Sequence, residues 1–172
     1  MNYPIIKSLL NFSKHEGFEK RALDLNQLVE ETLLLTQREL EEKGVRVEKQ
    51  LAPALPAVLG DSFELKGVLI NLLSNAMDAL PEGGVIGVAT HFDAKTSGEV
   101  ICTVRDNGKG IPEEYQERIF NPFFTTKEKT GGIGLGLSTS LSIMKKHNGM
   151  IAVKSKSGEG SAFSFALPSY RS

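Results

Sequence analysis

Near its centre the chain reads Asn71-Leu72-Leu73-Ser74-Asn75-Ala76-Met77-Asp78-Ala79. Residues three and four apart share one face of a helix, so Asn71, Asn75 and Asp78 form a polar stripe. Amide oxygens at this spacing suit a hard cation that a phosphate chain already neutralises, because Mg²⁺ takes few protein ligands of its own. The alternative is that Asn71 and Asn75 face solvent or cap a neighbouring loop, and the spacing leaves both interpretations open.

Capping signals and apolar periodicity place this stripe in a chain that mixes helices and strands. Asp24 with Gln27, and Asp61 with Glu64, form capping-box patterns before two helical runs of apolar residues. The elements follow no regular alternation, which favours a two-layer α+β sandwich of one five-stranded sheet against three helices. The predicted helices span 24–44, 61–80 and about 135–147, with a short one after Pro112, and the predicted strands cover 45–47, 85–92, 99–106, 150–156 and 161–167.

Composition limits the classes of partner. The 172 residues fit one globular domain, and a net charge of −1 lacks the concentrated positive field that nucleic acids require, so no nucleic-acid partner is expected. No apolar stretch approaches the ~20 residues that cross a bilayer, and the first residues lack the basic region, apolar core and small-residue cleavage site typical of a secretion leader, so we expect a cytoplasmic segment that is not membrane-inserted. Cys102 is the only cysteine, which excludes a disulfide framework, and we expect it to be buried in a strand.

The segment Asp106-Asn107-Gly108-Lys109-Gly110 follows an apolar strand. Asp106 has the same parity as the apolar residues of that strand, so its carboxyl group should point inward. Its glycines would allow a ligand to approach the backbone closely, and an exocyclic amine such as that of adenine could donate to the carboxylate. The alternative is an ordinary turn at the end of a hairpin, since Asp-Asn-Gly is a common turn sequence.

A second glycine-rich segment, 131–137, precedes a predicted helix. The N-terminus of a helix offers free N–H groups and a positive dipole end, and Lys127 and Lys129 lie nearby, so we expect this segment to bind phosphate. No Gly-Lys-Ser/Thr ends the segment and no strand directly precedes it, which excludes a P-loop and a Rossmann unit. A merely flexible connection is the alternative.

Three of the nine phenylalanines, Phe120, Phe123 and Phe124, gather in a stretch without periodicity. Apolar residues on such a segment are typical of a contact surface for a partner domain. A small satellite core under a loop is equally compatible with the sequence.

Together these segments resemble the four boxes of the catalytic domain of sensor histidine kinases. The N box corresponds to 71–79, the G1 box to 106–110, the F box to 120–124 and the G2 box to 132–137, and the resemblance covers about 22–168. It is strongest to kinases of the nitrogen-regulation type, which carry both Asn-Ala-x-Asp-Ala and Pro-Phe-Phe-Thr-Thr-Lys. The resemblance implies the Bergerat fold of gyrase and mismatch-repair ATPases, with a mixed, mostly antiparallel five-stranded sheet against three helices.

The resemblance also implies a site for ATP and Mg²⁺. Asn75 would be the magnesium ligand, Asn71 its phosphate-side or metal-side neighbour, and Asp106 the acceptor for the adenine amine. Ser161 would support the base, while Thr126, Lys127 and the G2 box would form the lid and the triphosphate cradle. The full implied set is Asn71, Asn75, Asp78, Asp106, Gly108, Gly110, Ile111, Thr126, Lys127, Gly132, Gly134, Leu135, Gly136, Leu137 and Ser161.

The chain departs from the resemblance at several positions. Ile133 stands where the family often has Thr or Ser, the stretch between Lys127 and the glycine box is slightly long, and Asp78 stands where many sensor kinases have a basic residue. Asn71 stands where hydrolytic relatives carry a water-activating glutamate, so ATP hydrolysis should be slow and the phosphoryl group should go to a positioned nucleophile.

In the family this nucleophile is a histidine on a preceding dimerisation domain. His15, His91 and His147 lack its sequence context and are expected to be surface or cap residues. Residues 1–20 resemble the end of that dimerisation domain and its linker, and 21–172 the catalytic domain. We therefore expect a fragment that binds ATP or ADP and serves the dimerisation domain and, indirectly, a response regulator receiver domain. A serine kinase or anti-sigma switch, a hydrolytic ATPase and a non-enzymatic binding module are the alternatives.

Overall fold

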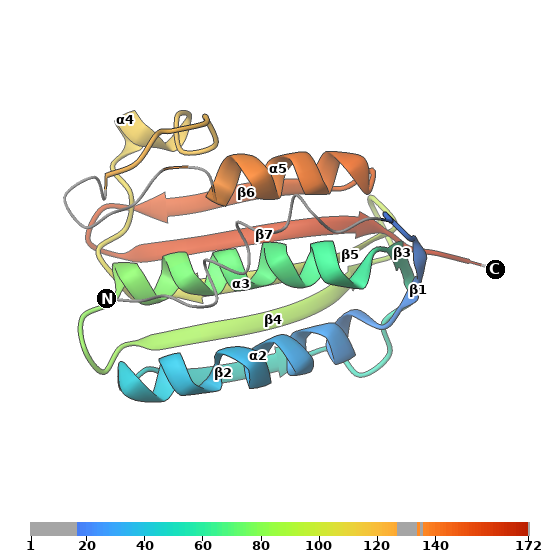
Figure 1. Cartoon of the computed structure of the whole chain (residues 1–172), viewed down its shortest axis with the longest axis horizontal. Helices are drawn as coiled ribbons and strands as arrows, with labels where there is room; N and C mark the ends of the chain where they lie inside the picture. The colour runs from blue at the N-terminus through green and yellow to red at the C-terminus, as the bar shows by residue number, and fades with distance from the viewer. Residues whose placement is uncertain (1–16, 127–133, 135, 172) are drawn as a thin grey trace.

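A computed structural model describes residues 17–126, 134 and 136–171 as a layer of helices on one face of a sheet. Three helices cover that face side by side, namely α2 (Leu25–Glu42), α3 (Ser62–Ala79) and α5 (Gly136–Lys146) (Figure 1). The single-turn helix α4 (Glu113–Gln116) lies apart from this layer. The capping boxes are confirmed in part, since Asp24 accepts hydrogen bonds from two backbone N–H groups at the start of α2 and Asp61 accepts one at the start of α3.

The sheet is mixed and mostly antiparallel, as predicted. Its strands lie in the order β2 (Arg46–Leu51), β4 (Val85–Asp93), β5 (Glu99–Asp106), β7 (Gly160–Pro168) and β6 (Met150–Lys156). Strands β2 and β4 are parallel, and the other neighbours are antiparallel. The edge strands of this single continuous sheet are β2 and β6.

Alternating burial along the strands builds the core between the two layers. In β5, Val100, Cys102, Val104 and Asp106 are buried, and the residues between them are less so. This confirms the inward parity of Asp106 and the burial of Cys102. Burial raises the pKa of the Cys102 thiol to about 12, so the thiol stays protonated and is not a nucleophile.

A second, two-stranded sheet was not predicted from the sequence. It pairs β1 (Arg21–Leu23) with β3 (Val58–Gly60) in antiparallel fashion. Each strand has only three residues, too few for an alternating pattern to be visible in the sequence. This small sheet ties residues 21–23 to the start of α3.

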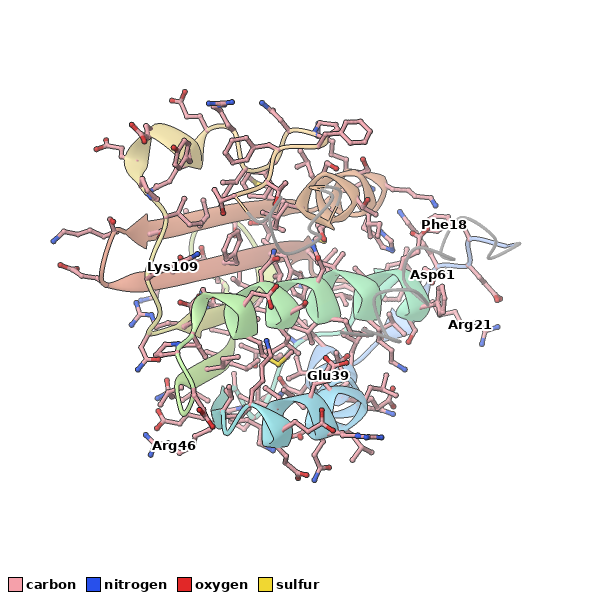
Figure 2. The ribbon with its side chains drawn as sticks, turned by 60° about the vertical axis from the view of Figure 1, so that its left-hand side comes forward. Phe18, Arg21, Glu39, Arg46, Asp61 and Lys109 are labelled. Atoms are coloured by element: carbon pink, nitrogen blue, oxygen red, sulfur yellow. The ribbon has the colours of Figure 1, made fainter. Side chains whose placement is uncertain are left out.

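The segment before β1 is anchored at the same end of the molecule. Glu19 N–H donates to Asp61 Oδ2 at 3.0 Å, while Asp61 Oδ1 caps α3 by accepting from Glu64 N–H. Phe18 meets His147 edge to face, with ring centroids 5.2 Å apart, and Lys146 Nζ lies 4.0 Å from the centroid of the Phe18 ring. Figure 2 shows Phe18 and Asp61 together at one end of α3, with Lys109 at the opposite end.

His147 was expected to be a surface or cap residue; it lies at the C-terminal end of α5, as a cap residue would, but it is buried and not on the surface. The residue is 2% exposed, and its Nε2 accepts a hydrogen bond from Asp61 N–H at 3.0 Å. This leaves Nδ1 to carry the proton and to donate to Ile143 O, 2.7 Å away. Burial lowers the pKa of His147, and it outweighs the Glu64 carboxylate 4.0 Å away, which favours the charged form.

Acidification should therefore destabilise the fold through His147. Its pKa is lowered in the folded state, so the unfolded chain binds the proton first, and stability falls as the pH drops below about 6.5. We expect the free energy of unfolding, measured with urea, to be lower at pH 5.5 than at pH 7.5. In His147→Gln, which cannot titrate, most of this loss should vanish. An equal loss in both proteins would show that other groups carry the pH dependence.

Candidate functional site

A polar row crosses one end of the sheet on the face that carries the helices. Asp106 of β5 is paired with Ser161 of β7, and Ser161 is paired with Ser155 of β6. Residues directly opposite each other on neighbouring strands point to the same face, so these three side chains form one line. Asp106 and Ser161 were predicted as site residues. Ser155 was not, because its place in the row depends on strand register.

Asp106 is a buried carboxylate with hydrogen-bonding capacity to spare. It is 4% exposed, and its Oδ1 accepts a hydrogen bond from Gly108 N–H at 2.9 Å. Burial raises the pKa of this carboxyl, against the backbone N–H groups of Gly108 and Ser161, which favour the charged form. An ionised carboxylate offers about four lone-pair sites, so Asp106 can accept a further hydrogen bond from a ligand.

The G1 glycines are required by close backbone packing. A Cβ at Gly108 would overlap Ala79 O at the end of α3, and Lys109 N–H donates to that same oxygen at 3.2 Å. Gly110 has a φ of +70°, and a Cβ there would overlap Lys156 O. The loop is thus held between α3 and the β6–β7 hairpin, with Asp106 at its base.

The exit of this loop is fixed by two residues that sequence reasoning missed. Ile111 N–H donates to Ser155 Oγ at 2.8 Å. Gln116 Nε2 donates to both Ile111 O and Ser155 O at 2.9 Å, which joins α4 to β6. The predicted residue Ile111 therefore lies beside Ser155. The predicted strands 150–156 and 161–167, paired end to end, would place Lys156 opposite Ser161, so only the observed register brings Ser155 into the row.

The polar stripe of α3 divides between two neighbours. Asn71 Nδ2 donates to Ser140 Oγ at 3.0 Å on α5, whereas Asp78 Oδ1 lies 3.3 Å from Lys43 Nζ, just beyond the end of α2. Asn75 is half-buried between them. The bond to Ser140 fixes the orientation of the Asn71 amide and leaves its Oδ1 beside Gly136, where a Cβ would overlap it. Ser140 was also missed, although it lies one helical turn after Gly136.

The glycine-rich segment is described only in part. Lys127, Gly132 and Leu135, all predicted phosphate-binding or lid residues, lie outside the described residues. Thr126 is exposed just before them, and Gly134 has a φ of +70° and accepts a hydrogen bond from Phe123 N–H at 2.9 Å. Helix α5 begins at Gly136, with Leu137 half-buried, so its N-terminal end lies next to Asn71.

The three phenylalanines have different surroundings. Phe120 packs against Phe163 of the sheet with centroids 6.5 Å apart, and Phe124 packs against Tyr115 at 5.7 Å. Phe123 is 73% exposed and has a φ of +65°, which is unusual for a bulky residue. Phe120 and Phe124 thus pack against the main core and form no separate satellite core, while Phe123 remains available to a partner.

Two general findings bear on the kind of site. Among the residues that the structure describes, no three or more His, Cys, Asp or Glu side chains gather as a metal site would require. Within the same part of the chain, no helix combines the length and apolar character needed to span a bilayer.

Comparison with known families identifies the class. Residues 60–171 match the family described as histidine kinase-, DNA gyrase B-, and HSP90-like ATPase, and the chain belongs to that family. It is 33% identical over 165 residues to sporulation kinase C of Bacillus subtilis, covering 95% of this chain and 37% of the relative. It is 39% identical over 172 residues to the alginate biosynthesis sensor protein KinB of Pseudomonas aeruginosa, covering 95% and 28%. The chain thus spans about a third of these relatives.

Solved structures share the fold. The catalytic domain of histidine kinase ThkA has a TM-score of 0.77 and 33% identity, with 90% of this chain and 97% of that chain covered. ThkA in complex with the response regulator protein TrrA has a TM-score of 0.78 and 30% identity, with 97% of this chain and 47% of that chain covered. Full-length ShkA in complex with AMPPNP has a TM-score of 0.81 and 26% identity, with 98% of this chain and 36% of that chain covered. The α+β fold is therefore that of histidine kinase catalytic domains.

Proposed function

We propose that this chain binds ATP and delivers the γ-phosphoryl group to a histidine on a dimerisation domain, for relay to a response regulator. The observation that carries the proposal is Asp106, a buried acceptor at the end of the sheet between α3 and the G1 loop. A buried carboxylate with unused lone pairs favours a ligand that brings a donor, as the adenine amine does. The AMPPNP complex of ShkA and the TrrA complex of ThkA support the same nucleotide and the same class of partner.

The residues around Asp106 fit a nucleotide. The first turn of α5 opens beside Asn71 and offers N–H groups and a positive dipole end to a phosphate chain. Gly136 keeps this approach clear, since a side chain there would overlap Asn71 Oδ1. The base would lie at Asp106 and Ser161, and the phosphates between α3 and α5. We keep Gly108, Gly110, Ile111, Thr126, Lys127, Gly132, Gly134, Leu135 and Leu137 as the remaining proposed contacts.

The same residues fit a magnesium ion. Asn75 would hold it and Asn71 would lie on its phosphate side, because neutral amide oxygens suit a cation whose other ligands are phosphate and water. Mg²⁺ in this place would neutralise charge on the triphosphate. The ion pair with Lys43 directs Asp78 toward α2, which makes Asp78 the outermost member of the proposed site.

Asn71 favours transfer over hydrolysis. A neutral amide held by Ser140 cannot accept a proton from water, so an attacking water would lack a general base at this position. Phosphoryl transfer depends chiefly on positioning, and a histidine brought to the γ-phosphate would supply its own nucleophile. In this proposal residues 1–20 belong to the dimerisation domain and its linker, and 21–172 form the catalytic domain.

Sequence motifs and exposed residues support proposals for the kinase subtype and for the surface that contacts the dimerisation domain. Asn75-Ala76-Met77-Asp78-Ala79 and Pro122-Phe123-Phe124-Thr125-Thr126-Lys127 support placement with kinases of the nitrogen-regulation type. The exposed Phe123, flanked by Phe120 and Phe124, would contact the dimerisation domain. ATP-dependent signalling would place the segment in the cytoplasm, where ATP is held.

Phosphotransfer to a supplied domain tests the proposal. The chain is incubated with γ-labelled ATP, Mg²⁺ and the purified dimerisation domain of its full-length kinase. We expect acid-labile, alkali-stable label on that domain, little phosphate release by the chain alone, and about tenfold less transfer by Asn75→Ala. Label on serine alone would point to a serine kinase. Rapid phosphate release without the second domain would point to a hydrolytic ATPase, and either result would contradict the proposal.

A further inference from the structure

Ser155 joins three groups at the edge of the proposed base site. Its Oγ accepts a hydrogen bond from Ile111 N–H at 2.8 Å, lies 2.9 Å from Gly160 O and lies 2.7 Å from Ser161 Oγ. Ser161 is 5% exposed and stands in register between Ser155 and Asp106. Ser155 thus touches Ser161 from the side opposite to Asp106.

The positions of the hydroxyl protons follow from this arrangement. A hydroxyl group has one proton to donate and two lone pairs. Gly160 O can only accept, so the Ser155 proton goes to it, and Ile111 N–H can only donate, so it takes one Ser155 lone pair. The remaining contact, with Ser161 Oγ, must then use the Ser161 proton. The Ser161 hydroxyl oxygen can therefore only accept hydrogen bonds from other groups.

We infer that Ser155 is a positioning residue that sets the base preference of the proposed nucleotide site through the Ser161 hydroxyl. This inference rests on the proposed function. With the Ser161 proton held by Ser155, Ser161 and Asp106 both offer only acceptors to a bound base. A 6-aminopurine presents an amine donor to this edge and is accepted. A 6-oxopurine presents a carbonyl there, and two acceptors facing it leave it unpaired.

The test compares ATP with ITP, which carries a 6-oxo group in place of the amine. Calorimetric titrations give the ratio of the two dissociation constants for the wild-type chain and for Ser155→Ala. In the variant the Ser161 proton loses its acceptor and can turn toward a 6-oxo group. We expect the ratio of the ITP dissociation constant to the ATP dissociation constant to be about fivefold to tenfold smaller in Ser155→Ala than in the wild-type chain. Ser155→Thr, which keeps the hydroxyl, should retain the wild-type ratio.

Ser164→Ala is the matched control. Ser164 lies on β7, and its Oγ is 2.7 Å from Thr103 Oγ1, so it has the same kind of hydroxyl pair outside the polar row. Its loss should leave the ratio unchanged. If Ser155→Ala does not fold, Ser155→Cys, with a weaker acceptor of similar shape, should show the same direction of change.

A double-mutant cycle separates positioning from a general structural role. Because Ser155 acts through Ser161, adding Ser155→Ala to Ser161→Ala should change the ratio no further. A further change of the ratio in the double mutant would overturn the inference about Ser155 but not the proposed function. An unchanged ratio in Ser155→Ala, with a wild-type chain that binds ATP, would have the same consequence. A wild-type chain that binds neither nucleotide would overturn the proposed function and this inference with it.

Discussion

Asp106→Asn is expected to weaken ATP binding about 100-fold, since hydrogen bonds to a charged acceptor contribute about 1.5–3 kcal/mol. The amide has almost the shape of the carboxyl group, and its oxygen can still accept from Gly108 N–H. Its NH₂ group would then face the adenine amine with a donor where an acceptor is needed. Calorimetric titration with ATP measures the loss.

The same substitution should leave the stability of the fold unchanged or raise it. Burial disfavours the charged form of Asp106, which is why its pKa is raised, and a neutral amide removes that penalty. We expect Asp106→Asn to unfold at the same temperature as wild type or higher. Asp93→Asn, at the exposed end of β4, is the control for loss of one negative charge and should bind ATP normally. Unchanged ATP affinity in Asp106→Asn would contradict the site.

Gly110→Ala is expected to destabilise the fold by about 3 kcal/mol or more. A φ of +70° costs an alanine about 1–2 kcal/mol, and its Cβ would also overlap Lys156 O, a backbone atom that cannot rotate away. Relief of the overlap would separate the G1 loop from the β6–β7 hairpin and displace Ile111 from Ser155. ATP affinity should fall together with stability.

Gly98 provides a control for the backbone conformation alone. It lies in the β4–β5 turn with a φ of +67°, and a Cβ there would meet nothing within 4 Å. Gly98→Ala should therefore cost only about 1–2 kcal/mol in urea unfolding and leave ATP affinity unchanged. Similar losses of stability in the two variants would show that the contact with Lys156 is not what makes glycine necessary at position 110.

Long elements with strong local signals could be predicted from the sequence. Helix α3 was recognisable because a cap at Asp61 precedes an apolar set that repeats over five turns, and Asp106 was placed inward by parity along β5. The β1–β3 pair escaped prediction because three residues show no period and their pairing joins segments that are far apart in the chain.

The partners of the site residues were harder to predict. Ser155 and Ser140 act through strand register and helix packing, and nothing in their immediate neighbourhood marks them. The burial of His147 was missed for the same reason, since it depends on Asp61 and Phe18 from distant segments. The local sequence indicates which side chains would contact the ligand, whereas tertiary contacts determine which other residues fix those side chains in position.

The most direct measurement is a crystal structure of the chain with AMPPNP and Mg²⁺. We expect the adenine amine to lie within hydrogen-bonding distance of an Asp106 carboxylate oxygen, with the phosphates between Asn71 and the first turn of α5. A nucleotide bound elsewhere, or a base that does not touch Asp106, would contradict the proposed site.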